Sequence, residues 1–299
     1  MTCSVSRSWF VVVGQALQPA PPSPLCPTRP DERLPDPTCL STEPLSGTPI
    51  RAYWTGASDG DLASLESGPL DPGIAKLLGL DNSAREWRVS RVRQVHGGDV
   101  VVDSASVGVA TDTVWDAVTG MAVDFRRATD SGETMTPAVS VCPEGDAILS
   151  REYGNCLLIV TADCMSIALG SPEGIYGAVH AGWRGLVAGV IENAIDRMYD
   201  HGASKVVAAI GPSIGKCCYE FSRNDASQLI DRYGESVMSL SSDGKDTVNL
   251  HSAAIQAIEK SGAELLWRSE DCTYCSGKYY SYRRGDGASR QGMFVWRDS

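Results

Sequence analysis

The sequence has no apolar run approaching the roughly 18–20 residues of a membrane-spanning helix, so an integral membrane protein is not expected. Positive charge is also scarce: 26 lysines and arginines stand against 37 aspartates and glutamates, a net charge of −11. Because an acidic chain repels phosphate backbones, we expect no nucleic-acid partner. With 42% hydrophobic and 21% charged residues, the composition is globular, which excludes a wholly disordered chain and a coiled coil.

Cysteine is too scarce for a disulfide-dense scaffold, because ten cysteines are spread irregularly over 299 residues. Two of them, Cys217 and Cys218, are adjacent, which does not suit a regular disulfide framework. We therefore expect reduced thiols, most of them packed as small buried hydrophobic side chains. This interpretation implies a reducing compartment, and we expect a cytoplasmic protein.

Proline is concentrated at the N-terminus, where ten of the sixteen prolines lie within residues 1–50. Because proline at this density blocks helices and sheet ladders, the sequence predicts a flexible leader at 1–48 and one folded domain at 49–299. The short apolar run Trp9–Val13 weakly resembles a signal peptide, but no clear small-x-small cleavage site follows it.

The elements of the domain are predicted from the period of its apolar residues. Alternation over 87–103 predicts two strands with a turn or bulge at Gly97 and Gly98. Residues 104–143 lack a helical period and are interpreted as an insertion, with a hairpin as one form. Buried strands are predicted at 156–169, 175–180 and 205–210, and helices at 186–201, 224–233 and 249–261. Because strands and helices interleave, we expect an α/β or α+β class with a mixed sheet.

Histidine is scarce as well, since the chain has only four. His201 lies at the end of one predicted helix and His251 near the start of another, where structural or surface roles are expected. His96 and His180 differ from these two. Each lies at the edge of a predicted strand and is followed closely by glycine, which lets a ligand approach.

Cys164 is the last residue of Thr161-Ala-Asp-Cys164 within the buried strand predicted at 156–169. A short turn joins that strand to the one carrying His180, so Cys164 and His180 are expected to be cross-strand neighbours. With His96 they provide one thiolate and two imidazoles, the ligand set of a catalytic zinc with one open position. Two other interpretations stay open. In the first, the three side chains are only packed and hydrogen-bonded. In the second, Cys164 is a nucleophile with His180 as its base and Asp163 or His96 as the orienting group.

Two segments suit the binding of an anion. Gly182-Trp-Arg-Gly185 precedes a predicted helix, where free N–H groups attract negative charge, and Arg184 adds a bidentate donor. The competing interpretation is a close-packed corner between strand and helix. The Tyr-Arg-Arg sequence at 282–284 combines an aromatic ring with positive charge, a combination that suits the binding of a base and an anion. The competing interpretation is that these side chains simply face solvent.

The remaining cysteines gather in two segments. The loop Gly211–Glu220 is expected to offer backbone N–H groups to an oxygen, with Cys217 or Cys218 facing the site. Cys272-Thr-Tyr-Cys275 suggests a zinc knuckle or a redox pair. A structural zinc needs a second pair, for which only Cys217 and Cys218 are available, and a redox pair belongs at a helix start. We therefore favour packed or hydrogen-bonded thiols.

Five segments in this order resemble the laccase-domain family, or multicopper polyphenol oxidoreductases, and within it the bacterial purine nucleoside phosphorylase and adenosine deaminase type. The segments are Gln94–Gly97, Thr161–Cys164, His180–Gly185, Gly211–Glu220, and Cys272–Ser276 with Ser281–Arg284. The similarity covers roughly residues 50–297, so the domain at 49–299 is expected to be catalytic. It implies a single α/β domain with layered mixed β-sheets flanked by helices.

The resemblance also implies one zinc ion bound by His96, Cys164 and His180, the trio that the residue types suggest independently. It implies phosphorolysis of adenosine, inosine, guanosine and methylthioadenosine, with adenosine deaminase as a side activity. The partners are then a purine nucleoside and phosphate; the sequence does not determine an oligomeric state. The expected catalytic residues are Cys164, His180 and Arg184, and the expected substrate or phosphate contacts are Gly182, Gly185 and Arg283.

The sequence departs from the family pattern at three places. The family opens with a Phe-Thr-x-Arg-x-Gly-Gly segment, whereas Tyr53–Gly60 contains no arginine. If that arginine holds phosphate or substrate, the departure bears directly on phosphorolysis. Ser166 and Lys216 each stand where the family has proline.

Three alternative functions remain. The first is a metal-free hydrolase or deamidase that uses Cys164 and His180. The second is a copper polyphenol oxidase of the laccase kind, but four histidines cannot supply the roughly ten that its copper clusters need. The third is a non-catalytic relative that binds nucleosides.

Overall fold

The computed structural model describes residues 45–65, 67–81, 86–103, 113–115, 122–124 and 143–298. The predicted leader at 1–48 lies outside these residues except for 45–48, which form a turn into the first strand. Most of the predicted insertion at 104–143 also lies outside them.

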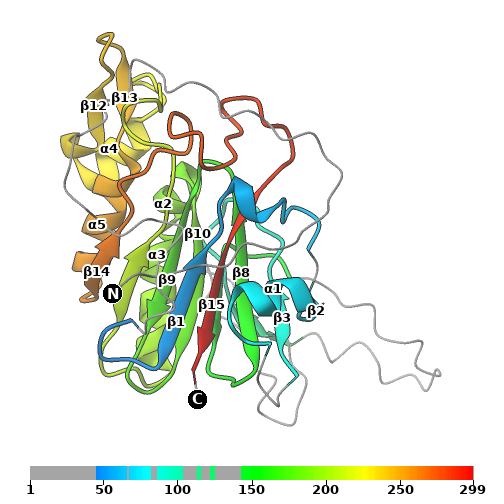
Figure 1. Cartoon of the computed structure of the whole chain (residues 1–299). Coiled ribbons are helices and arrows are strands. Elements are labelled where there is room, and N and C mark those ends of the chain that lie inside the picture. The colour runs from blue at the N-terminus through cyan, green and yellow to red at the C-terminus, as the bar shows by residue number, and fades with distance from the viewer. Residues whose placement is uncertain are drawn as a thin grey trace, which may run out of the picture.

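Two large mixed sheets form the centre of the part of the chain that the structure describes (Figure 1). The first sheet contains, in spatial order, β1 (Ile50–Trp54), β15 (Gln291–Arg297), β8 (Asn155–Thr161), β3 (Arg88–Arg91) and β2 (Gly68–Pro69). The second contains β14 (Glu264–Arg268), β11 (Val207–Ile210), β9 (Met165–Gly170), β10 (Tyr176–Ala181), β7 (Ala147–Ser150), β4 (Val100–Val102), β5 (Thr113–Trp115) and β6 (Ala122–Asp124). A separate antiparallel pair is formed by β12 (Met238–Leu240) and β13 (Asp246–Val248).

The helices are α1 (Pro72–Leu77), α2 (Trp183–Ala188), α3 (Val190–Asp200), α4 (Ser227–Tyr233) and α5 (Leu250–Lys260), with short 3-10 helices at Ala57–Asp59 and Glu235–Val237. The strand pairs β3–β8, β4–β7 and β11–β14 are parallel, and the other described ladders are antiparallel. The α/β class with layered mixed sheets is therefore confirmed.

The layers follow from the two faces of each strand. In β9, Ile167 and Leu169 pack with residues of α3 and α5, whereas Ala168 packs toward the other sheet. In β8, Leu157 and Ile159 join Ala168 in the layer between the two sheets. Because both faces of these strands are covered, their sequences are apolar throughout. The opposite face of the first sheet packs against α1.

The prediction of one strand at 156–169 is wrong, because the segment forms two strands in different sheets. β8 ends at Thr161 and pairs with β15 and β3, whereas β9 begins at Met165 and pairs with β10 and β11. The chain changes sheets at a turn in which Asp163 has φ +99°. Since both strands are buried on both faces, the apolar pattern contains no sign of the break.

The helix predicted from residue 186 is two helices, α2 and α3, because Gly189 between them adopts φ +78°. The helices predicted at 224–233 and 249–261 are confirmed as α4 and α5. In the described residues, none of the helices combines the length and the apolar character that crossing a membrane requires.

The two strands predicted in 87–103 are β3 and β4, which lie in different sheets. The chain therefore crosses between the layers at His96–Asp99. Within the predicted insertion, β5 and β6 pair antiparallel and extend the second sheet, in agreement with a hairpin.

Gly211 follows β11 where the chain passes directly over the Trp54 indole. A Cβ atom there would overlap the indole ring, which is held by a 3.1 Å hydrogen bond from Nε1 to Ser166 Oγ. We expect Gly211→Ala to lower the free energy of unfolding by about 1–3 kcal/mol, because the buried site becomes overpacked. Urea denaturation measures this loss. Gly97→Ala is the matched control, since its Cβ would lie 3.6 Å from the nearest atom; equal losses in both variants would contradict the account.

Candidate active site

The site is organised by Asp146, which precedes β7 and whose side chain is fully buried. Its carboxylate accepts the backbone N–H groups of Val95, His96 and Gly97 at 2.5–3.2 Å. It also accepts a hydrogen bond from Nδ1 of His180 at 2.7 Å. Burial alone would raise the pKa of Asp146, but the hydrogen bonds from His180 and from these N–H groups lower it below its usual value. The carboxylate is therefore ionised and joins the two histidine-bearing segments.

His96 lies on the loop that crosses between the sheets, and its backbone has φ +62°, a left-handed conformation that is uncommon for histidine. The three N–H groups bound to Asp146 hold this conformation. Gln94 fixes the start of the loop, because its amide donates to the carbonyl of Val160 at 2.8 Å and accepts from its N–H at 3.1 Å. The side chain of His96 itself is exposed.

His180 lies on β10 and is only 3% exposed. Because Nδ1 is hydrogen-bonded to Asp146, the other ring nitrogen is free to face Cys164. A carboxylate behind a histidine in this way is the usual support of a metal-binding imidazole. Burial would lower the pKa of His180, but hydrogen bonds to Asp146 and Cys164 raise it to about 9.

Cys164 lies in the turn between β8 and β9, beside the end of β10, rather than within the predicted strand. Its Sγ is 3.9 Å from His96 Nε2, and the ligand atoms of Cys164, His96 and His180 all lie within 4.8 Å of one another. Tetrahedral zinc holds such ligand atoms about 3.3–3.8 Å apart, so small adjustments bring the trio onto one ion. Burial would raise the pKa of the Cys164 thiol, but the two histidines lower it to about 6, which favours the thiolate.

The corner at Gly182–Gly185 packs tightly against this trio. A Cβ at Gly182 would lie 2.9 Å from Cys164 Sγ and 3.2 Å from His96 Cδ2. Gly185 approaches the carbonyl of Gly97, with a distance of 3.3 Å for its missing Cβ. Both glycines are thus required for the close approach of strand, helix and loop; their binding of phosphate stays a prediction.

Three aromatic rings form a row that ends in an arginine on each side. Trp183 at the start of α2 contacts Phe221, and Phe221 contacts Tyr219, with ring centroids 5.5 and 5.3 Å apart. Arg184 lies over the Trp183 ring at 4.4 Å, and Arg283 lies over the Tyr219 ring at 5.0 Å. We call these five residues the aromatic wall. Both arginines are exposed, so their guanidinium groups are accessible to an anion.

Tyr219 connects the aromatic wall electrostatically to the trio. Burial raises the pKa of its hydroxyl to about 12, and the neighbouring charge on Cys164 adds to this shift, whereas Arg283 and Arg184 oppose it. The hydroxyl is therefore protonated at neutral pH and is able to donate a hydrogen bond.

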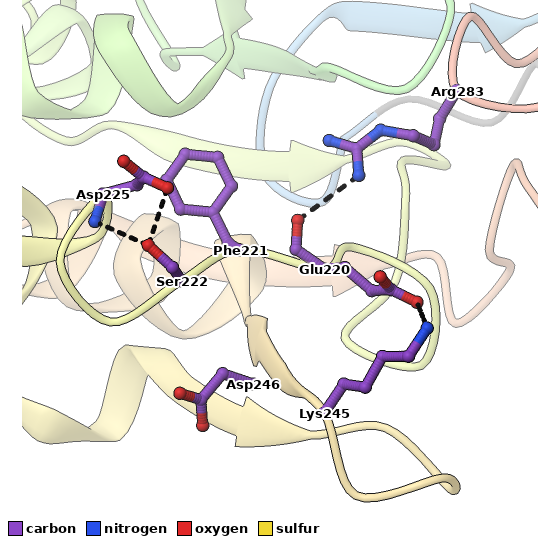
Figure 2. Close-up of a pocket in the computed structure, with 7 residues that line it drawn as sticks. All are labelled: Glu220, Phe221, Ser222, Asp225, Lys245, Asp246 and Arg283. Atoms are coloured by element: carbon purple, nitrogen blue, oxygen red, sulfur yellow. Dashed lines mark hydrogen bonds and ion pairs between the residues drawn. The ribbon is translucent and has the colours of Figure 1, made fainter.

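An open cavity of about 600 Å³ lies against this wall (Figure 2). Figure 2 shows Arg283 directed at the Glu220 carbonyl, which it reaches at 3.3 Å, and the ion pair of Glu220 with Lys245 at 2.7 Å. The cavity is lined by Glu220, Phe221, Ser222, Asp225, Lys245, Asp246 and Arg283.

Other residues singled out in the sequence have structural positions. Arg284 donates to the carbonyls of Thr273 and Tyr274 and is engaged within the protein. His201 caps the end of α3, and His251 hydrogen-bonds Ser213 at 3.1 Å.

The sequence led us to expect that Cys217 or Cys218 would face the candidate site, but neither belongs to the group formed by His96, Cys164 and His180. They belong to a separate group of sulfur atoms with Cys272 and Cys275.

Sequence reasoning missed Asp146 and assigned Asp163 only as an optional orienting group. The carboxylate of Asp163 accepts from Thr273 Oγ1 at 2.6 Å and from the Arg283 N–H at 2.7 Å. It thereby ties the Cys164 turn to the C-terminal loops. The only available signal for Asp146 was an acidic residue placed directly before a buried strand.

A family model described as multi-copper polyphenol oxidoreductase laccase matches residues 75–298. The chain belongs to this family. The resemblance seen in the five sequence segments is thus confirmed.

The chain is similar to proteins named purine nucleoside phosphorylase. One from Streptomyces griseus is 30% identical over 274 residues, covering 86% of this chain and 98% of the relative. One from Deinococcus radiodurans is 36% identical over 148 residues, covering 48% of this chain and 57% of the relative.

Solved structures show the same fold. A Neisseria meningitidis protein matches with a TM-score of 0.60 at 19% identity, covering 86% of this chain and 96% of the other. YlmD from Geobacillus stearothermophilus matches with a TM-score of 0.59 at 23% identity, covering 84% of this chain and 92% of the other.

We expect Asp146→Asn to weaken the binding of an added metal ion at this trio by about 10- to 100-fold, because the charge that supports the His180 imidazole is lost. Competition with a chromophoric chelator measures the affinity. Asp103→Asn is the matched control, since Asp103 is half-buried and bonds Asn155 and Ser90 rather than a histidine. An equal loss in the control, or none in Asp146→Asn, would refute the role of this carboxylate.

Proposed function

We propose that this chain is a zinc-dependent purine nucleoside phosphorylase with a purine nucleoside and phosphate as its substrates. The observation that carries the proposal is the convergence of His96, Cys164 and His180, with ligand atoms within 4.8 Å of one another, next to the aromatic wall. The names of the relatives from Streptomyces and Deinococcus support the same activity.

The donor set suits zinc better than the copper clusters of a laccase. One thiolate and two imidazoles are ligands that zinc accepts, and they leave a fourth position open. His201 lies at the end of α3, and His251 is hydrogen-bonded to Ser213. Neither belongs to the group formed by His96, Cys164 and His180. Among the described residues, which include all four histidines, one centre contains two histidines and none contains more. When bound, zinc supplies Lewis acidity that polarises an oxygen atom in the site.

The aromatic wall suits a purine nucleoside. The faces of Trp183, Phe221 and Tyr219 offer stacking area for a base, and the protonated Tyr219 hydroxyl offers a donor. Arg184 and Arg283 at its two ends offer planar donors that match a phosphate. The proposed roles of these side chains are to orient the base and to hold phosphate for attack on the sugar C1′, with loss of the purine.

The proposal extends to adenosine, inosine, guanosine and methylthioadenosine as nucleosides, and to deamination of adenosine at the same centre. Gly182 and Gly185 are proposed to add backbone N–H groups to the phosphate site. Reduced Cys164 is required throughout, which agrees with a proposed location in the cytoplasm.

We expect Arg184→Ala to reduce phosphorolysis of inosine by about 10- to 100-fold, because a charge-assisted contact to phosphate is lost. Deamination of adenosine needs no phosphate and should fall much less. Steady-state kinetics of both reactions on one preparation measure the difference. Arg197→Ala, on the surface of α3, is the control and should change neither reaction. Equal losses of both activities in Arg184→Ala would disprove this division of roles.

The function is tested by measuring zinc content and inosine phosphorolysis in the native protein and in Cys164→Ala. We expect the variant to lose one equivalent of zinc together with turnover. Cys156→Ala removes a buried thiol outside the site and should retain both.

Two results would contradict the proposed function. Full turnover after removal of the metal would favour a Cys164 and His180 hydrolase, which uses the same thiolate as a nucleophile. Zinc and tight nucleoside binding without turnover would indicate a non-catalytic relative.

A further inference from the structure

Four cysteines meet at one edge of the second sheet. Cys217 and Cys218 lie in the loop after β11, and Cys272 and Cys275 lie in the turn after β14. Because β11 and β14 pair in parallel, the segments that follow them emerge at the same edge. The topology therefore joins two cysteine pairs that are far apart in the sequence.

The sulfur atoms are spaced as ligands of one metal ion. All four lie within 4.8 Å of one another, with Cys217 Sγ 3.5 Å from Cys218 Sγ and 3.8 Å from Cys275 Sγ. Zinc with four thiolates separates its sulfurs by about 3.8 Å, whereas a disulfide requires about 2.05 Å. None of these four described cysteines forms a disulfide.

The backbone around the sulfurs is fixed without any ion. The N–H of Thr273 donates to the Ser213 carbonyl at 3.0 Å, which joins the two segments directly. The N–H of Gly215 donates to Cys272 Sγ at 3.2 Å, a contact that stabilises a thiolate. A Cβ at Gly215 would lie 3.2 Å from both Cys217 Sγ and Cys272 Cβ, so glycine provides the room for the sulfurs.

The burial of the cluster and a neighbouring arginine suit a group of four thiolates. Cys272 and Cys275 are buried, while Cys217 and Cys218 are half-buried and leave a route for an ion. Arg284 contacts the carbonyls of Thr273 and Tyr274 at 2.9 and 2.7 Å, which places a positive charge beside the turn, where it offsets part of the negative charge of four thiolates.

We propose that Cys217, Cys218, Cys272 and Cys275 bind a structural Zn²⁺ ion as four thiolates, at a second centre separate from His96, Cys164 and His180. Each thiol releases its proton to solvent as it binds, and no oxidant or reductant is involved. The site has no open position, so it is structural rather than catalytic. It cross-links the loop that carries Tyr219 and Phe221 to the C-terminal turn.

The full-length Cys164→Ala variant, purified under reducing conditions, isolates this centre from the candidate active site. Elemental analysis should find one zinc per chain. After zinc is removed, added Co²⁺ should give the intense near-ultraviolet sulfur-to-cobalt absorption of four thiolates, and added Zn²⁺ should abolish that absorption. Absence of bound metal together with absence of this absorption would overturn the proposal, as would a disulfide among the four cysteines in the intact mass.

A second variant tests the identity of the ligands. Adding Cys275→Ser to Cys164→Ala should remove the remaining zinc and lower the midpoint of thermal unfolding, whereas adding Cys156→Ser should leave the zinc in place. Zinc retained at full stoichiometry in the Cys275→Ser protein would overturn the assignment. If that protein does not fold, the metal content and cobalt spectrum of Cys164→Ala decide alone. Neither measurement depends on nucleoside turnover, so the outcome for this second zinc site is independent of the outcome for the proposed function.

Discussion

The geometry of the candidate active site depends on one buried carboxylate, that of Asp146. Burying a charge is costly unless hydrogen bonds compensate for lost water, and Asp146 receives three backbone N–H groups and one imidazole. These donors come from the loop of His96 and from β10, which carries His180. The pairing of β10 with β7 adds a 2.7 Å hydrogen bond from the His180 N–H to the Asp146 carbonyl. Strand register therefore sets the distance between the two histidines.

A second acidic residue, Asp163, fixes the turn that carries Cys164, as Asp146 fixes the segments that carry the two histidines. Its backbone turns at φ +99° between the two sheets, and its carbonyl and carboxylate bind Ile214, Thr273 and Arg283. The turn that presents Cys164 is thus tied to the loops that carry the aromatic wall and the four clustered thiols. Left-handed non-glycine backbones cost on the order of 1–3 kcal/mol. Of the two described examples, His96 belongs to the trio and Asp163 directly precedes Cys164.

The sequence suggested His96, Cys164 and His180 as one candidate site because histidine is scarce and two of the four histidines lie at predicted strand edges before glycines. The structure brings the ligand atoms of these three residues within 4.8 Å of one another. It did not predict Asp146, whose partners lie 34 and 50 residues away along the chain and follow no period. The division of 156–169 into two strands left no mark in the apolar pattern, since both strands are covered on both faces. The thiol cluster depends on the parallel pairing of β11 with β14, which single motifs do not reveal.

The central claim is that His96, Cys164 and His180 bind one zinc ion with His180 supported by Asp146. Anomalous diffraction from crystals of active protein, recorded on both sides of the zinc absorption edge, tests it most directly. The account predicts an anomalous peak bonded to Cys164 Sγ and one nitrogen of each histidine, with His180 Nδ1 still on Asp146. Crystals of protein with proven phosphorolytic activity that show no peak at this trio would contradict it.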